Sequence, residues 1–185
     1  MTSYGHFGVV GGGAWGTALA QLLAAEGAPV TIWAREEEVV AAINAEHRNP
    51  LFLPGAALSP SLVATADPGA LAGCDALLVV VPVPFLRAVL ADLPAGDSPL
   101  VFCSKGMEAG SFAFPIDIAR RLCPGRPLAV LSGPTFAHEV AAGLPTAITL
   151  AADDAATAEA LAQALARPHF RPYVSTDMIG AEIGG

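Results

Sequence analysis

The sequence predicts a doubly wound α/β fold, in which a mostly parallel sheet carries helices on both faces. Two observations support this prediction. Short apolar runs alternate with helical patterns along nearly the whole chain, and the connections between them are short. Hydrophobic residues make up 54% of the 185 residues, as expected for parallel strands buried on both faces. The length fits one large domain, or one domain with part of another.

The strands and helices can be placed from the apolar runs, the helical periodicity and the turn residues between them. We expect strands at residues 7–10, 30–33, 62–65, 76–81, 100–103, 128–131, 146–151 and 170–174. We expect helices at residues 17–25, 36–46, 84–93, 114–122, 136–141 and 155–166. A loop over residues 48–60, rich in proline, is long enough to cover a site. Ligands of such folds bind beyond the carboxyl ends of the strands, so functional side chains are expected directly after each strand.

A glycine-rich segment, GGGAWG at residues 11–16, follows the first expected strand and leads into a helical run. In a Rossmann-type fold Gly11 permits the tight turn, and Gly13 lets the backbone approach a dinucleotide pyrophosphate. Gly16 lets the helix pack close to its strand, and the helix start offers N–H groups and a positive dipole end. The motif therefore predicts a phosphate-binding turn, with a purely structural glycine turn as the alternative.

Charge and composition exclude several classes of partner. The formal net charge of −8 argues against a nucleic-acid partner, which requires a basic face. The longest apolar run, residues 76–86, is interrupted by two prolines and is shorter than the roughly 20 residues that span a bilayer, so no membrane partner is expected. No secretory signal is visible. Cys74, Cys103 and Cys123 have no metal-binding spacing, and we expect reduced, mostly buried thiols in a cytoplasmic protein.

Arg35 is the first long side chain after the second expected strand. NAD-selective folds usually place a carboxylate at this strand end, where it binds the ribose 2′-hydroxyl. A guanidinium instead suits a 2′-phosphate and can stack on adenine, which favours NADPH as an accepted or preferred cofactor. The alternative is a solvated arginine at a helix start, balanced by Glu36 and Glu37.

Two later strand ends carry candidates for binding an anionic substrate. Lys105, the single lysine of the chain, follows the fifth expected strand, where its ammonium can bind a substrate oxygen or phosphate. Gly133 follows the sixth strand and allows close approach of a ligand, and Ser132 or Thr135 is expected to cap the next helix. His138 is expected to be exposed or structural rather than a general acid. The alternative for Lys105 is an exposed turn residue.

Six segments occur in an order that is typical of one family. They are GGGAWGTALA (11–20), WAR (33–35), LPG (53–55), SKGME (104–108), LSGPTFA (131–137) and DMIGAEIGG (177–185). In these segments the chain resembles bacterial NAD(P)-dependent glycerol-3-phosphate dehydrogenase. The resemblance implies a doubly wound, mostly parallel Rossmann-type sheet with helices on both faces. It also implies interconversion of sn-glycerol 3-phosphate and dihydroxyacetone phosphate with NAD or NADP as cofactor, feeding phospholipid synthesis.

The same resemblance implies a role for individual residues. The glycine turn would bind the pyrophosphate, Arg35 the adenosine ribose, and Lys105 both the nicotinamide side and the substrate. The implied cofactor-binding residues are Gly11, Gly13, Ala14 (where some members have serine), Trp15, Gly16, Arg35, Lys105 and Ala137. The implied substrate-binding residues are Lys105, Gly133 and Thr135.

The resemblance further implies a catalytic lysine and a helical domain beyond residue 185. The family's general acid/base lysine, in an Ala-Leu-Lys-Asn segment, would follow Gly185 almost immediately, so no catalytic residue is expected in residues 1–185. We expect a dinucleotide-binding domain over residues 1–175 and the start of a linker helix to a helical domain over 176–185. Residues 1–185 would then bind cofactor but turn over poorly, since losing a proton donor typically costs about 10²–10⁴-fold. A homodimer, if formed, would use the helical domain.

Two other functions stay open from the sequence. One is a different two-domain NADP-dependent reductase, of the β-hydroxyacid or ketopantoate type, which shares the glycine turn but gives no reason for the SKGME segment. The other is a non-catalytic dinucleotide-binding module.

Overall fold

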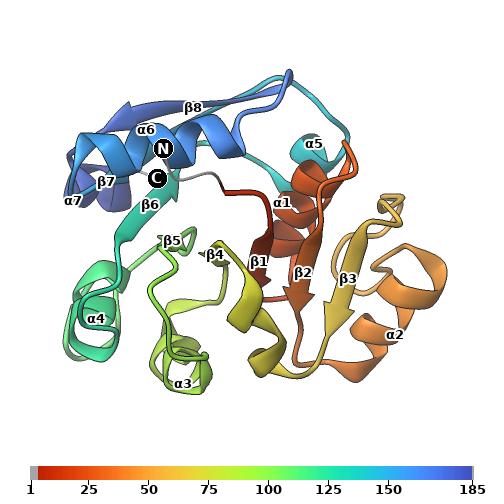
Figure 1. The fold of residues 1–185 in the computed structure, drawn as a ribbon, viewed down its shortest axis with the longest axis horizontal. Coiled ribbons are helices and arrows are strands. Elements are labelled where there is room, and N and C mark those ends of the chain that lie inside the picture. Colours follow the sequence, from red (N-terminus) through yellow and green to blue (C-terminus); the bar gives the residue numbers. More distant parts are fainter. Residues whose placement is uncertain (1–3, 185) are drawn as a thin grey trace.

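Eight strands form a single sheet in the computed structural model, which describes residues 4–184 (Figure 1). The strand order is β3-β2-β1-β4-β5-β6-β7-β8. Neighbouring strands are parallel except β6 and β7, which pair antiparallel. The strands are β1 (Phe7–Val10), β2 (Val30–Trp33), β3 (Leu62–Thr65), β4 (Ala76–Val79), β5 (Leu100–Phe102), β6 (Leu128–Ser132), β7 (Thr146–Ala152) and β8 (Phe170–Ser175). All eight expected strands are found, with ends within two residues of the prediction.

The helices also follow the prediction, with one change of type. The expected helix at residues 84–93 begins as a 3₁₀ turn over Val83–Phe85 and becomes α-helical at Leu86. The helices are α1 (Ala14–Ala24), α2 (Glu37–Glu46), α3 (Leu86–Asp92), α4 (Pro115–Leu122), α5 (Ala137–Ala141), α6 (Ala155–Leu165) and α7 (Met178–Ile183), with 3₁₀ turns η1 (Pro68–Gly73) and η2 (Val83–Phe85). Within residues 4–184, no helix has both the length and the apolar character needed to cross a membrane.

Helices cover both faces of the sheet because successive strand residues point to opposite sides. Val9 packs into one buried cluster with α1, α2, α5 and α6. Its neighbour Val10 packs into a second cluster with η1, α3, α4 and α7. In β4, Leu78 packs into the first cluster and its neighbour Val79 into the second. The doubly wound, mostly parallel Rossmann-type fold is therefore confirmed.

The strand order creates a crevice between β1 and β4. The chain runs from β1 outward to β2 and β3, and then returns to form β4 on the other side of β1 (Figure 1). Ligands of doubly wound sheets bind at this reversal, beyond the carboxyl ends of the strands. The segments after β1, β2, β4, β5 and β6 all lie at this edge, because these strands are parallel.

The last helix, α7, is docked on the sheet through a buried carboxyl group. Met178 and Ala181 are buried in the second cluster, and Glu182 is only 8% exposed. The Glu182 carboxylate accepts a hydrogen bond of 3.1 Å from the backbone N–H of Ile116, in the first turn of α4. Glu182 also lines a small cavity, together with the charged side chains of Asp117, Arg120, Asp153 and Asp177. Burial raises the pKa of Glu182 to about 7.

Glu182→Gln is expected to abolish a pH-dependent loss of stability. The folded state holds a proton on Glu182 that the unfolded chain, with a pKa near 4.5, releases. The free energy of unfolding therefore falls as pH rises from about 4.5 to about 7, and stays low at higher pH. Glutamine keeps an acceptor for Ile116 without the charge, so the variant should gain about 1–3 kcal/mol at pH 8.

Urea unfolding between pH 5 and pH 8 measures this effect. Glu159→Gln, at an exposed position of α6, is the control and should leave the pH profile unchanged. A Glu182→Gln profile that keeps the wild-type slope would contradict the assignment of that slope to the buried carboxyl group.

Candidate cofactor-binding site

The turn after β1 is built around Gly11. Its φ of +122° is a conformation that residues with a side chain rarely adopt, as the predicted tight turn requires. The Gly11 N–H donates a 2.9 Å hydrogen bond to the carbonyl of Trp33 at the end of β2. A Cβ at Gly11 would lie 2.7 Å from the carbonyl oxygen of Val80, just after β4. Three strand ends therefore meet at this residue.

Gly16 packs α1 against the turn, as the sequence predicted, and Gly13 leaves the space that its predicted role requires. A Cβ at Gly16 would lie 1.9 Å from the carbonyl oxygen of Gly11, so α1 can approach the turn only with glycine here. A Cβ at Gly13 would meet no atom within 4 Å, so the backbone there faces open space. Gly13 is the N-cap of α1, whose first turn carries no acidic side chain. The positive end of the helix is thus open to a phosphate.

Asn49 holds the glycine turn in place, and sequence analysis did not identify it. Its Nδ2 donates to the carbonyl of Gly12 (2.9 Å) and to Oγ1 of Thr17 (2.8 Å). Its Oδ1 accepts from the backbone N–H of Phe52 (3.1 Å). Asn49 and Thr17 are both completely buried. The predicted covering loop is therefore fastened to the turn, and Phe52 reaches the site from it.

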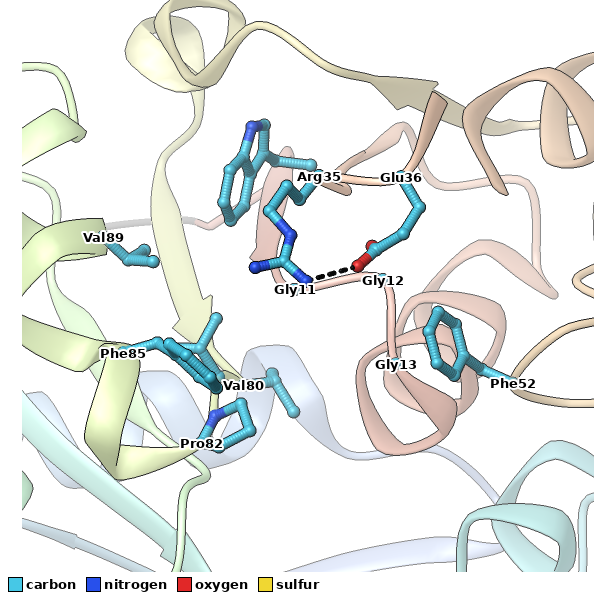
Figure 2. Close-up of a pocket in the computed structure, with 12 residues that line it drawn as sticks. Gly11, Gly12, Gly13, Arg35, Glu36, Phe52, Val80, Pro82, Phe85 and Val89 are labelled. Carbon is cyan, nitrogen blue, oxygen red and sulfur yellow. Dashed lines mark hydrogen bonds and ion pairs between the residues drawn. The ribbon is translucent and has the colours of Figure 1, made fainter. Parts of the chain in front are cut away.

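A cavity of about 230 Å³ opens beside the glycine turn (Figure 2). In Figure 2, Phe85, Pro82 and Val89 form one wall, Phe52 lies on the opposite side, and Arg35 extends over the turn. The cavity is lined by Gly11, Gly12, Gly13, Trp33, Arg35, Glu36, Phe52, Val80, Val81, Pro82, Phe85 and Val89. Aromatic and aliphatic walls joined to a polar glycine turn fit an adenosine group attached to a pyrophosphate.

Arg35 shows features of both roles considered for it. It lines the cavity, and its guanidinium carbon lies 6.0 Å from the centre of the Phe85 ring. Its Nη2 also lies 3.0 Å from Oε1 of Glu36, and 74% of the Arg35 side chain is exposed. The guanidinium is therefore placed to meet a cofactor, but it is already paired with a carboxylate.

Lys105, Gly133 and Thr135 come together, as their positions after β5 and β6 predicted. The Lys105 Nζ donates to the carbonyl of Gly133 at 3.0 Å, and the Thr135 N–H donates to the same oxygen at 3.0 Å. The Oγ of Ser104 donates to the carbonyl of Val81 at 2.6 Å, and Val81 lines the cavity. The segment that carries Lys105 is thus hydrogen-bonded through Ser104 to a residue of the cavity wall.

The loop that carries Lys105 is anchored at Glu108, the last residue of the SKGME segment. Both carboxylate oxygens of Glu108 accept from Arg87, at 2.6 and 2.8 Å, and Ser111 donates to the same carboxylate. These hydrogen bonds lower the pKa of Glu108 to about 2. No local sequence pattern indicated this pair, which connects the loop to α3.

Three of the remaining candidates lie away from the cavity lining. Trp15 and Ala137 are half-buried at the starts of α1 and α5 and pack against the core. His138 is exposed, as expected, with its ring 5.9 Å from that of Phe136. The expectation that Ser132 or Thr135 caps α5 is wrong. Thr135 donates to Gly133 in a turn, and the helix starts after Phe136 without a side-chain cap.

The fold and the site define a Rossmann-type α/β protein, with an open glycine turn and a cavity at the reversal of strand order. The family model "NAD-dependent glycerol-3-phosphate dehydrogenase N-terminus" matches residues 6–158. The chain belongs to this family, as its motifs indicated. Within residues 4–184, no three His, Cys, Asp or Glu side chains are grouped to hold a metal ion. Cys74 and Cys103 are buried, Cys123 is half-buried, and all three are free thiols.

Curated relatives and solved structures agree with the family. The chain is 81% identical over 185 residues to "Glycerol-3-phosphate dehydrogenase [NAD(P)+] 1" of Sphingopyxis alaskensis, covering all of the chain and 56% of that relative. It is 58% identical to the enzyme of Rhodospirillum rubrum, over 97% of the chain and 53% of the relative. The crystal structure of glycerol-3-phosphate dehydrogenase from Coxiella burnetii superposes with a TM-score of 0.89 at 33% identity, over 98% of this chain and 56% of that one. The chain spans about half the length of these relatives.

Proposed function

We propose that residues 1–185 bind NAD or NADP, and that a protein containing them interconverts glycerol 3-phosphate and dihydroxyacetone phosphate. The observation that carries this proposal is the open glycine turn at the strand-order reversal, in a chain of this family. The matched relatives carry that activity and NAD(P)+ in their names. The crystal structure of a "Probable 2-dehydropantoate 2-reductase" from Bacillus subtilis is only 22% identical, so it supports the shared fold alone.

The residues of the site divide between the two ends of a dinucleotide. The backbone from Gly11 to Gly16, with the start of α1 at Ala14 and Trp15, would hold the pyrophosphate. Arg35 would contact the adenosine ribose, and Ala137 would touch the cofactor from α5. When bound, the nicotinamide supplies or accepts the hydride. The chain's own contribution is to orient it against the substrate.

Lys105 is the cation at the substrate end of the site. Its ammonium lies 3.0 Å from the carbonyl of Gly133 and would hold a substrate oxygen or phosphate near Gly133 and Thr135. Reduction of the ketone also needs a proton as the oxygen becomes an alkoxide. We assign this proton donor, as the family resemblance implies, to a lysine beyond Gly185. Residues 1–185 would then bind cofactor with little turnover.

The domain boundary belongs to the same proposal. Residues 1–175 would form the cofactor-binding domain, and residues 176–185 would begin a linker helix. Helix α7 is the part of this linker that the structure describes. Ile179 and Ile183 support this proposal, because 59% and 66% of these apolar residues are exposed on α7. Cytoplasmic location, a role in phospholipid synthesis and a homodimer through the following domain complete the proposal.

Turnover assays test the proposal. Residues 1–185 would be compared with the same residues joined to the remaining part of the S. alaskensis relative, which is 81% identical over the shared part. We expect the joined polypeptide to oxidise NADH or NADPH in the presence of dihydroxyacetone phosphate, and residues 1–185 alone to be at least 100-fold slower. Equal rates would contradict the assigned proton donor. Reduction of ketopantoate but not dihydroxyacetone phosphate would contradict the proposed substrate.

A further inference from the structure

The buried amide of Asn49 uses all of its hydrogen-bonding groups on the glycine turn and on the covering loop, residues 48–60. Its Oδ1 faces the N–H of Phe52, which can only donate, so its Nδ2 must face the turn. One hydrogen of Nδ2 is then used for the carbonyl of Gly12, and the other for Oγ1 of Thr17. The Thr17 hydroxyl donates its own hydrogen to the same Gly12 carbonyl, at 3.2 Å. The Gly12 carbonyl is therefore held by two buried donors.

These two hydrogen bonds set the direction of the peptide group that joins Gly12 to Gly13. This peptide bond is trans, and in a planar trans peptide the C=O and the N–H point in opposite directions. The C=O points inward, to Asn49 and Thr17, which are completely buried and lie outside the cavity lining. The N–H of Gly13 therefore points outward, on the side where Gly12 and Gly13 line the cavity. Gly13 is the N-cap of α1, where outward N–H groups can bind an anion.

The glycine residues cannot hold this direction by themselves. Glycine adopts many backbone conformations, so a peptide group between two glycines can turn over easily. Close packing requires glycine at position 12, because a Cβ there would lie 2.5 Å from Cβ of Ala34. A peptide group that turned over would present its carbonyl oxygen to a phosphate and repel it. The rigidity that a phosphate site needs must therefore come from Asn49 and Thr17.

The same asparagine also holds the wall of the cavity opposite Phe85. Besides the hydrogen bond from Phe52 to its side chain, its backbone carbonyl accepts from the N–H of Leu53 at 2.9 Å. Phe52 lies beside the start of α1 at Gly13 (Figure 2). Asn49 thus connects a wall residue with the turn, although it does not line the cavity itself.

We propose that Asn49 is a positioning residue for the bound pyrophosphate: it holds the Gly12 carbonyl inward and so keeps the Gly13 N–H directed at the anion. It acts through the peptide group and does not touch the cofactor. This inference rests on the proposed cofactor-binding function and deepens it, because it assigns the donor direction of the turn to one side chain.

Equilibrium titrations of the chain with ADP and with adenosine test the inference. ADP carries a pyrophosphate, and adenosine shares its base and ribose only. Asn49→Ala is expected to weaken ADP binding by at least about tenfold, the loss expected for a charge-assisted hydrogen bond, and adenosine binding by less than about threefold. In the wild-type chain, ADP should also move the amide proton resonance of Gly13 downfield, as a new hydrogen bond to a phosphate requires.

Asn44→Ala is the matched control. The Asn44 amide also makes two hydrogen bonds to backbone groups, with the carbonyl (2.9 Å) and the N–H (2.8 Å) of Ala64 in β3, and it lies outside the cavity lining. Its loss should leave both affinities within about twofold of the wild-type values. Thermal unfolding shows whether each variant is folded.

Thr17→Val is a second variant, which decides the matter if Asn49→Ala does not fold. It keeps the shape of the side chain and removes one of the two donors to Gly12. We expect it to weaken ADP binding by about twofold to fivefold, with adenosine binding unchanged. Unchanged ADP affinity in Thr17→Val would then overturn the inference.

The outcomes separate this inference from the proposed function. Unchanged ADP affinity in folded Asn49→Ala, or ADP binding that leaves the Gly13 amide unmoved, would overturn the role of Asn49 while leaving cofactor binding in place. Equal losses for ADP and adenosine would also overturn it, because Asn49 would then act through the wall at Phe52. If the folded wild-type chain binds neither ADP nor NADH, the proposed function and this inference both fail.

Discussion

Replacing Lys105 with methionine in the joined polypeptide is expected to lower kcat/KM for dihydroxyacetone phosphate by at least about 100-fold. The substitution removes the ammonium that lies 3.0 Å from the Gly133 carbonyl, at the ligand-binding edge of the sheet. Methionine has a similar length and apolar stem, so the loop held by Glu108 and Arg87 should keep its conformation. Affinity for the cofactor is expected to fall less than tenfold, since the glycine turn is unchanged.

Initial-rate kinetics and calorimetry on the same samples measure the two effects. Arg120→Met is the matched control, because Arg120 is an exposed cation of α4 that pairs with Asp153, just before α6. It should leave kcat/KM within about twofold of the unmodified protein. A Lys105→Met protein with normal kcat/KM would remove Lys105 from the substrate-binding residues and favour its interpretation as an exposed turn residue.

Replacing Gly16 with alanine is expected to destabilise the chain by about 3 kcal/mol or more and to abolish measurable cofactor binding. The new Cβ would lie 1.9 Å from the carbonyl oxygen and 3.1 Å from the carbonyl carbon of Gly11. Both atoms belong to the backbone of the turn, which Asn49 and Thr17 fix through the neighbouring Gly12. The clash can therefore be relieved only by moving α1 away from the turn.

Gly13→Ala separates the effect on stability from the effect on binding. Its φ is −69° and its Cβ would meet no atom within 4 Å, so the free energy of unfolding should change by less than about 1 kcal/mol. The methyl group would, however, occupy the space into which we place the pyrophosphate, and affinity should fall by more than about tenfold. Urea unfolding and cofactor titration measure both. Normal affinity in Gly13→Ala would contradict the pyrophosphate assignment.

The sheet was predictable because its sequence signals are local. Residues 7–10 form an apolar run that ends at glycines, and such a run can be buried only between helices. The meeting of Lys105 with Gly133 was also predictable, because both follow parallel strands that end at the same edge. In each case a local pattern and one general rule of parallel sheets were sufficient.

The contacts that complete the site depend on residues distant in sequence, and no local pattern indicates them. In the sequence, Asn49 is an ordinary loop residue. Its role depends on the loop folding over the turn, where it donates a hydrogen bond to Gly12. In the sequence, Glu36 is a solvated charge at a helix start, and only the position of α2 shows that it lines the cavity. The Glu182 carboxylate meets Ile116 only because α7 returns to the sheet. The incorrect cap at α5 arose because a turn at Gly133 precedes the helix.

The proposed function depends on a dinucleotide binding at the glycine turn between β1 and β4. The most direct test is a titration of isotope-labelled residues 1–185 with NADH, followed by the backbone amide resonances. We expect saturation to shift the amides of residues 11–16 and 35–36 most strongly, while the amides of β8 remain unaffected. Saturable binding that leaves the amides of residues 11–16 unchanged would contradict it.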